Sequence, residues 1–332
     1  MAPLGIAFSG GPGPAEIAGC IRLAEELGYE SAWVAEGHGG DQFATLAAAA
    51  MQTSRIRLGT SITSVFVRTV PTIAMAAATV DDISSGRFIL GLGSSHKVQV
   101  EGEHGVAYGK PLTRVRESVA FIRRLLRDGR AGYAGETVRI DNFDLWFAPR
   151  RREVPIYVSA VFPKMIALCG EIADGVMLTR STLSTAAAVR RQLAEAARSA
   201  GRDPERIVTA SLLPTMVAES RADALAALRP GLAFYAGFFP RYNRLMAEHG
   251  FAEEAAAIAA AWAKDDRQAA ERAVSDALID ATSIAGTPQQ CRERIAEYRA
   301  SGLDLPILSP FARGPGARAC FEDVIRACAP TI

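Results

Sequence analysis

Residues 85 to 96 read Ser-Gly-Arg-Phe-Ile-Leu-Gly-Leu-Gly-Ser-Ser-His. Ser85-Gly86 is typical of a helix end, and Arg87 to Leu90 is a largely apolar run of strand length. Gly91 and Gly93 then lack a Cβ, and polar residues follow. Glycine lets a ligand approach the backbone closely. The stretch is therefore interpreted either as a buried central strand with a glycine-rich exit or as a strand whose end forms the floor under a flat ligand.

Seven further stretches have the composition of strands, and a helical pattern follows nearly all of them. They are residues 4–8, 31–36, 56–62, 154–160, 175–179, 206–216 and 305–308. Strict alternation of strands and helices indicates parallel strands, because right-handed crossovers join them. Eight such units in 332 residues predict an α/β fold, a (β/α)8 TIM barrel. A doubly wound open sheet is the competing fold.

Three segments depart from this repeat. Residues 97–109 predict a glycine-rich loop, and residues 130–148 predict a small hairpin excursion after the fourth strand. A helical insertion is predicted before the eighth strand, at about residues 221–280. All these segments are expected to belong to a single domain that spans residues 1–332. The aromatic side chains of residues 234–242 are expected to line a substrate lid, to form a dimer contact, or simply to pack between helices.

Composition narrows the functional classes. The formal net charge of +1 gives no basic field that would attract nucleic acid. Five scattered cysteines without a Cys-x-x-Cys pair indicate reduced thiols rather than disulfides or a zinc site. The sequence shows neither a signal peptide nor an uninterrupted run of about 18 apolar residues that would predict a membrane span. We therefore expect a cytoplasmic protein that acts on a small-molecule substrate and binds neither nucleic acid nor membrane.

Two glycine-rich stretches lack the spacing of nucleotide-binding motifs. Residues 9–14 resemble a phosphate-binding P-loop only in glycine content and lack its Gly-x-x-x-x-Gly-Lys-Ser/Thr spacing. Gly91-Leu-Gly93 would need a third glycine at position 96, which is His96, and the next helix begins too far downstream for a dinucleotide fold. Neither stretch predicts a nucleotide site.

In a barrel, the active site lies at the carboxyl ends of the strands. Those ends carry mainly hydroxyl groups and small residues: Ser9, Glu36 to His38, Thr60 to Thr63, Ser94 to His96, Ser159 to Phe162, Thr179 to Ser181 and Ser309 to Arg313. The acid/base pair of a hydrolase is not evident. His38, His96 and His104 are interpreted as one catalytic or substrate-facing histidine and two loop histidines, with a metal site as the alternative. A hydroxyl-rich, apolar mouth suits a large planar cofactor.

Three stretches together resemble the bacterial luciferase-like superfamily, and in particular its branch of oxidoreductases that use the deazaflavin coenzyme F420. They are residues 85–95, 114–117 and 154–176. Residues 285–290 with Arg294 are similar to the last barrel unit of that family. The resemblance covers most of the chain except residues of about 221–280. It implies a TIM barrel that holds F420, or alternatively FMN, at the strand ends.

The resemblance also implies where the cofactor lies. In relatives the third strand ends in a bulge behind the ring, often with a non-prolyl cis peptide, and the end of the fourth strand is near the ring. The corresponding residues here are Thr60, Ser61, Ile62, Gly93, Ser94 and Ser95. The cofactor phosphate is held after the fifth and sixth strands, which corresponds to Ser159, Ala160, Val161, Phe162, Pro163, Thr179 and Arg180. Backbone amides at a helix N-terminus suit an anion; for Ser159 and Thr179, capping of the strand ends is the alternative.

The sequence departs from its relatives at three places. Some relatives have a histidine directly after the acidic residue that ends the second strand, whereas here Gly37 follows Glu36 and the histidine is His38. Val161-Phe162 replaces two glycines found in some relatives after the fifth strand. His96 stands where certain sugar-phosphate dehydrogenases have an acidic group. A sugar phosphate is therefore not assumed as the substrate.

The resemblance predicts hydride transfer between C5 of F420 and a small organic substrate with a C=C, C=N or carbonyl group. His38, or in second place His96 or Glu36, would handle the proton, since the ordinary pKa of histidine, about 6.5, suits that task. The alternatives are an FMN-dependent monooxygenase and a non-catalytic barrel that binds a flavin-like ligand. Relatives are often dimers, so we expect a homodimer.

Overall fold

Within residues 2–330, which this computed structural model describes, eight parallel strands form a closed barrel. In order around it they are β1 (Gly5–Phe8), β2 (Ser31–Val34), β3 (Arg57–Thr60), β5 (Phe88–Gly93), β8 (Ile156–Ser159), β9 (Gly175–Thr179), β10 (Val208–Val217) and β12 (Leu305–Pro310). β12 pairs with β1, with Gly5 opposite Ile307, which closes the ring. The predicted TIM barrel is confirmed, and the open sheet is wrong because an open sheet would leave β1 and β12 unpaired. The expected domain limits, residues 1 and 332, lie outside the described residues.

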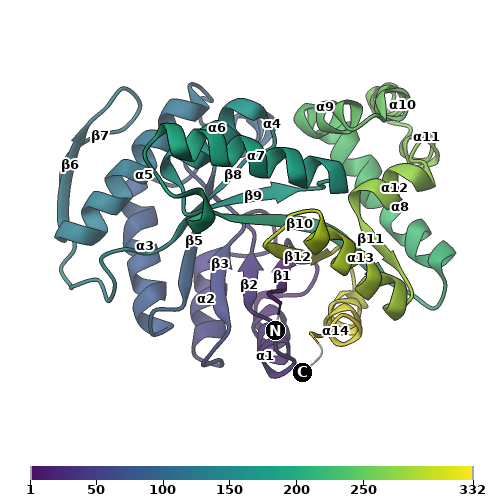
Figure 1. Ribbon diagram of the computed structural model, residues 1–332, viewed down its shortest axis with the longest axis horizontal. Coiled ribbons are helices and arrows are strands. Elements are labelled where there is room, and N and C mark those ends of the chain that lie inside the picture. The colour runs from purple at the N-terminus through teal and green to yellow at the C-terminus, as the bar shows by residue number, and fades with distance from the viewer. Residues whose placement is uncertain (1, 331–332) are drawn as a thin grey trace.

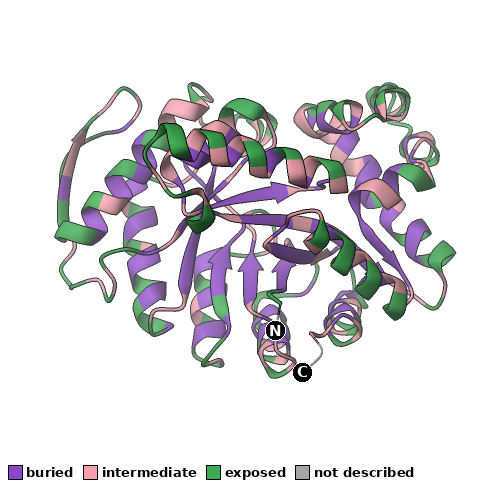
Figure 2. Cartoon of the chain, viewed as in Figure 1, coloured by how far each residue is buried: buried purple, intermediate pink, exposed green. Residues whose placement is uncertain are grey.

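The side chains that alternate along the strands form two cores. One set packs inside the barrel: Ala7, Trp33, Ile89, Tyr157, Met177, Ala210, Leu305 and Ile307. The neighbouring positions, such as Ile6, Phe8 and Leu90, pack against the surrounding helices. The strands are therefore buried on both faces, as parallel strands of α/β proteins are, and Figure 2 shows them buried along nearly their whole length.

Helices follow the strands and cover the outside of the barrel (Figure 1). They are α1 (Pro14–Glu26), α2 (Gln42–Ala50), α3 (Val70–Ile83), α4 (Lys97–Gly102), α5 (Pro111–Asp128), α6 (Pro163–Ile172), α7 (Leu183–Ser199), α13 (Pro288–Ala300) and α14 (Ala317–Ala327), with a 3-10 turn at Pro204–Arg206. Thr287 and Gln290 form a capping box at the start of α13. The expectation of a loop over residues 97–109 is wrong in its first half, because Val100 is buried and holds α4 against the barrel.

The excursion after the fourth barrel strand is an antiparallel hairpin of β6 (Arg130–Ala134) and β7 (Arg139–Asp144). Both strands lie within the segment 130–148, where the hairpin was expected. The Glu117 carboxylate accepts hydrogen bonds from the backbone N–H groups of Glu136, Thr137 and Val138 at 2.7–2.9 Å and from the Thr137 hydroxyl. These bonds lower the pKa of Glu117 to about 2 and fix the hairpin to α5.

Five helices lie between β10 and β12, at the end of the molecule opposite the hairpin (Figure 1). They are α8 (Arg221–Phe238), α9 (Pro240–Glu248), α10 (Ala252–Ala263), α11 (Arg267–Arg272) and α12 (Asp276–Thr282). They have an apolar core of their own, which includes Leu228, Leu232, Met246, Ile258 and Leu278. We call α8 to α12 the helical wall.

Two short strands were not predicted. β4 (Thr63–Ser64) pairs with β5, and β11 (Ile284–Gly286) pairs with β10. Both are too short to produce a periodic apolar pattern. None of the helices within residues 2–330 combines the length and the apolar character that a bilayer crossing requires.

Candidate functional site

A cavity of about 560 Å³ opens at the carboxyl ends of the strands. Strand ends line one side of it, and α8 and α9 of the helical wall line the other. Of the predicted site residues, those that line the cavity are Glu36, His38, Ser61, Ile62, Ser94, Ser95, His96, Ser159, Ala160, Val161, Phe162, Thr179 and Arg180. The structure therefore brings together residues that are up to 144 positions apart in the chain, from Glu36 to Arg180.

The floor of the cavity is built where β3 and β5 meet. The Thr60 hydroxyl donates to the Gly91 carbonyl at 2.8 Å and accepts from the Gly91 N–H at 2.9 Å. A Cβ on Gly91 would lie 1.9 Å from the Thr60 carbonyl oxygen, so this close contact requires glycine. Thr60 is buried beneath the cavity and does not line it, which makes it a support of the floor.

The bulge after β3 lies above that contact. The peptide bond between Ser61 and Ile62 is cis, as in relatives of the family that the sequence resembles. The Ser61 hydroxyl is buried and has no hydrogen-bond partner within the described residues. Gly93 also lies behind the surface of the floor, since a Cβ there would come within 2.7 Å of Ile62 Cδ1. The floor thus offers bare backbone and an unsatisfied hydroxyl.

The three candidate proton-handling residues differ in their surroundings. Glu36 accepts hydrogen bonds from Arg68 Nε and, at 3.3 Å, from the Ser64 N–H, so its carboxylate is already paired. The His38 side chain is 79 % exposed, and its Nε2 lies 3.2 Å from Glu103 Oε2. His38 is therefore the most exposed of the three candidates.

His96 lies deeper and is partly buried. Its ring packs against the rings of Phe239 and Tyr242, with centroid distances of 4.4 and 4.7 Å. Burial, together with the positive charges of Arg241 and Arg180, lowers the pKa of His96 to about 4. At neutral pH the His96 ring is uncharged, and it can donate or accept a hydrogen bond but carries no proton ready for release.

Arg180 follows β9 at the side of the cavity where the cofactor phosphate is expected. The residue is only 8 % exposed, and its Nε has no partner within the described residues. Its guanidinium carbon lies 3.7 Å from the centroid of the Tyr235 ring, a cation–π contact. Pro163 begins α6 just after Phe162 and stands behind the cavity lining. The arrangement suits an anion, because it combines a buried unpaired cation with the start of a helix.

The helical wall contributes aromatic side chains. Those that line the cavity are Phe234, Tyr235, Phe238, Phe239 and Tyr242. They contact one another, and Phe311 after β12 contacts Tyr235. This observation favours the substrate-facing interpretation of residues 234–242 over ordinary helix packing. Arg68, Glu103 and Arg241 were not predicted as site residues, because their partners are distant in the chain.

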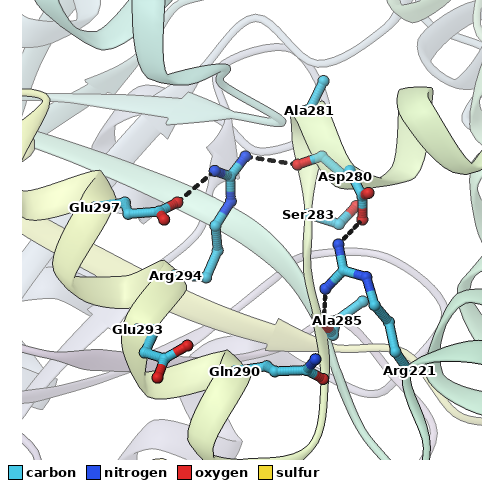
Figure 3. A pocket seen from close by; sticks show the side chains of 9 residues that line it. All are labelled: Arg221, Asp280, Ala281, Ser283, Ala285, Gln290, Glu293, Arg294 and Glu297. Atoms are coloured by element: carbon cyan, nitrogen blue, oxygen red, sulfur yellow. Dashed lines mark hydrogen bonds and ion pairs between the residues drawn. The ribbon is translucent and has the colours of Figure 1, made fainter.

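A second hollow, of about 500 Å³, lies between β11 and α13 (Figure 3). Four of its five charged groups form ion pairs, Arg221 with Asp280 and Arg294 with Glu297. The fifth, Glu293, accepts a hydrogen bond from the Gln289 amide. Both guanidinium groups also donate to backbone carbonyls, of Ala285 and Asp280. They are therefore not free to bind a ligand, and the mouth of the barrel is the better candidate site. Within residues 2–330, no group of three or more His, Cys, Asp or Glu side chains is placed to hold a metal ion.

Comparison with known proteins bears on the family and the fold. The family model for luciferase-like monooxygenases matches residues 4–305. The chain is 32 % identical over 303 residues, 90 % of each chain, to a 5,10-methylenetetrahydromethanopterin reductase of Methanolobus tindarius. The coenzyme F420-dependent tetrahydromethanopterin reductase of Methanopyrus kandleri superposes with a TM-score of 0.86 at 28 % identity, over 98 % of each chain. An F420-dependent secondary alcohol dehydrogenase superposes with a TM-score of 0.78 at 22 % identity, over 98 % of this chain and 99 % of that one, and shows likeness of fold alone.

Proposed function

We propose, since the chain belongs to the luciferase-like monooxygenase family, that it is an F420-dependent oxidoreductase acting on a small organic substrate. The relatives named above as F420-dependent or methylenetetrahydromethanopterin reductases support the enzyme class and the cofactor. The observation that carries the proposal is the floor formed by Ser61, Ile62 and the end of β5, which lies beside the buried, unpaired Arg180. We further propose that residues 1–332 act as one domain with an insertion of about 221–280.

The residues of the mouth fit this cofactor. Ser61 offers a buried hydroxyl without a partner, and the strand end at Gly93 to Ser95 offers backbone free of bulky side chains. The anionic part would be held by Arg180, Thr179 and the segment Ser159 to Pro163. When bound, F420 supplies a carbon, C5, that donates or accepts a hydride. The chain's own residues would hold the substrate over that carbon and exclude water from it.

We propose that His38 donates or accepts the proton that accompanies hydride transfer. Glu36 is held by Arg68, and His96 is uncharged at neutral pH, whereas His38 lines the cavity and is exposed to solvent. Replacing His38 by Gln is expected to lower kcat at least 10-fold while leaving the Kd for F420 within a factor of two. Equal turnover by wild type and His38→Gln would show that another group or solvent handles the proton.

The central test is a pair of titrations of the purified chain with F420 and with FMN. We expect saturable binding of F420 and oxidation of reduced F420 by unsaturated acceptors with a C=C, C=N or carbonyl group. Arg180→Gln should weaken F420 binding about 10-fold, since a charge-assisted contact to an anion is lost. Arg191→Gln removes the same charge from the exposed face of α7 and is the matched control. Binding of FMN alone, with oxygen consumption from its reduced form, would favour a monooxygenase instead.

We also propose that the chain forms a homodimer, as relatives of the family often do. Light scattering on a sizing column measures the mass directly. A mass of about 35 kDa at micromolar concentration would exclude the dimer, since one chain has a mass of 35.3 kDa.

A further inference from the structure

Three arginines line the mouth without a carboxylate partner. Among residues 2–330, no Asp or Glu oxygen lies within 4 Å of the guanidinium nitrogens of Arg180, Arg241 or Arg313. Of the two carboxylates that line the same cavity, Glu36 pairs with Arg68 and Glu103 lies 3.2 Å from His38, so the three guanidinium groups face one carboxylate that has no arginine or lysine partner. The free charge of the mouth is therefore positive.

Arg180 and Arg241 reach the mouth of the barrel from opposite sides. Arg180 follows β9, whereas Arg241 belongs to α9 of the helical wall. Both lie close enough to His96 to act on its ring electrostatically. Arg241 donates weakly to the Ser95 carbonyl at 3.4 Å, and Arg180 donates weakly to the Thr179 hydroxyl at 3.4 Å. Since a guanidinium has five N–H donors, most of the donors on both remain unused.

Keeping a guanidinium buried without a counter-charge is costly. Arg180 is more than nine-tenths buried, and the cation–π contact with Tyr235 compensates for only part of its lost hydration. A bound anion would satisfy both arginines at once. Arg180 belongs to the proposed phosphate segment after β8 and β9, whereas Arg241 comes from the helical wall and reaches across to the Ser95 carbonyl at the end of β5.

We propose that the substrate carries an anionic group, a carboxylate or a phosphate, that binds to Arg241 and shares Arg180 with the cofactor, while a flat part of the substrate lies against the aromatic side chains of α8 and α9. This inference rests on the proposed function, because it treats the strand ends as the cofactor side of the mouth. It commits to a substrate class, flat organic anions, that the enzyme class alone does not specify.

Pairs of aromatic acids and their amides test the charge preference without knowledge of the natural substrate. Benzoate and benzamide, cinnamate and cinnamamide, and 2-naphthoate and 2-naphthamide differ in charge but hardly in shape. Their Kd values are measured by calorimetry on the F420-loaded wild-type chain, on Arg241→Gln and on Arg191→Gln. We expect at least one acid to bind about 10-fold more tightly than its amide in wild type and in Arg191→Gln, and the preference to disappear in Arg241→Gln.

These outcomes distinguish an anionic group of the substrate from the anionic part of F420. If no acid binds more tightly than its amide, or if the preference survives in Arg241→Gln, the proposal is wrong. If Arg241→Gln weakens F420 binding 10-fold instead, Arg241 holds the anion of the cofactor and the proposal is again wrong. The Kd of F420 for wild type is measured first: if F420 does not bind, the proposed function fails, and the acid–amide comparison is then made on the chain without cofactor.

Discussion

Replacing Gly91 by alanine tests the contact that supports the floor of the mouth. The new Cβ would lie 1.9 Å from the Thr60 carbonyl oxygen and 3.0 Å from the Thr60 carbonyl carbon. Ordinary contact between non-bonded heavy atoms is about 3.5 Å, so β3 and β5 must move apart by roughly 1 Å or more. That movement also stretches the two hydrogen bonds between Thr60 and Gly91.

The expected loss of stability follows from these two effects. Overpacking in a core costs about 1–3 kcal/mol, and weakening two buried hydrogen bonds adds about 1 kcal/mol or more. The entropy of unfolding of a chain of 332 residues is about 0.7 kcal/mol/K. A loss of about 3 kcal/mol therefore lowers the Tm by about 4 °C.

Differential scanning calorimetry at one fixed scan rate measures the shift, because large chains often unfold irreversibly. The matched control is Gly19→Ala in α1, where a Cβ would meet no atom within 4 Å. That helical site should gain about 0.5–1 kcal/mol, or about 1 °C. The affinity for F420 should fall in Gly91→Ala and not in Gly19→Ala, since only the first moves the floor. A Gly91→Ala variant that melts within 1 °C of wild type would refute this account of the floor.

Three further outcomes are expected. Glu117→Gln should lose about 3 kcal/mol of stability at pH 7, since the pKa of Glu117 in the folded chain is about 2 against an ordinary 4.5. This contribution is present above about pH 4.5 and is lost as the pH falls towards 2. Urea unfolding curves of wild type and variant should therefore differ at pH 7 and converge at pH 2. His96 should stay uncharged down to about pH 4, which NMR of its ring protons measures, and a titration near pH 6.5 would contradict its burial beside Arg241. Arg87→Lys should lose about 2 kcal/mol of stability, because the guanidinium donates to the carbonyls of residues 50, 53, 56 and 84 and an ammonium cannot reach all of them. Thermal unfolding measures this loss, and an unchanged Tm would contradict it.

The barrel could be predicted because its strands are buried on both faces. Stretches such as Arg87 to Leu90 and Gly175 to Thr179 are short apolar runs between helical patterns, and that alternation leaves little choice of topology. Capping by Thr287 and the amphipathic pattern of α5 were likewise evident, since both depend on residues a few positions apart.

The rest of the structure depends on contacts between residues far apart in sequence. β4 and β11 exist because a neighbouring strand pairs with them, and two or three residues carry no periodicity. The sequence does not show that Glu36 contacts Arg68, so it could not show that the Glu36 carboxylate is already paired. Arg241 is one of many arginines in the sequence, and only the folded chain shows that α9 brings it to the mouth. Of the cofactor residues implied by the resemblance, all but Thr60, Gly93 and Pro163 line one cavity, and their roles stay predictions.

The separate apolar core of the helical wall has a consequence for how such an enzyme diversifies. Leu228, Leu232, Met246 and Ile258 pack with one another rather than with the core between the barrel and its helices. Substitutions on the cavity side of α8 and α9 therefore strain the helical wall, which can repack without unfolding the barrel strands. Selection can then explore new acceptors by changing one side of the mouth while the opposite side, where we propose that the cofactor binds, stays intact.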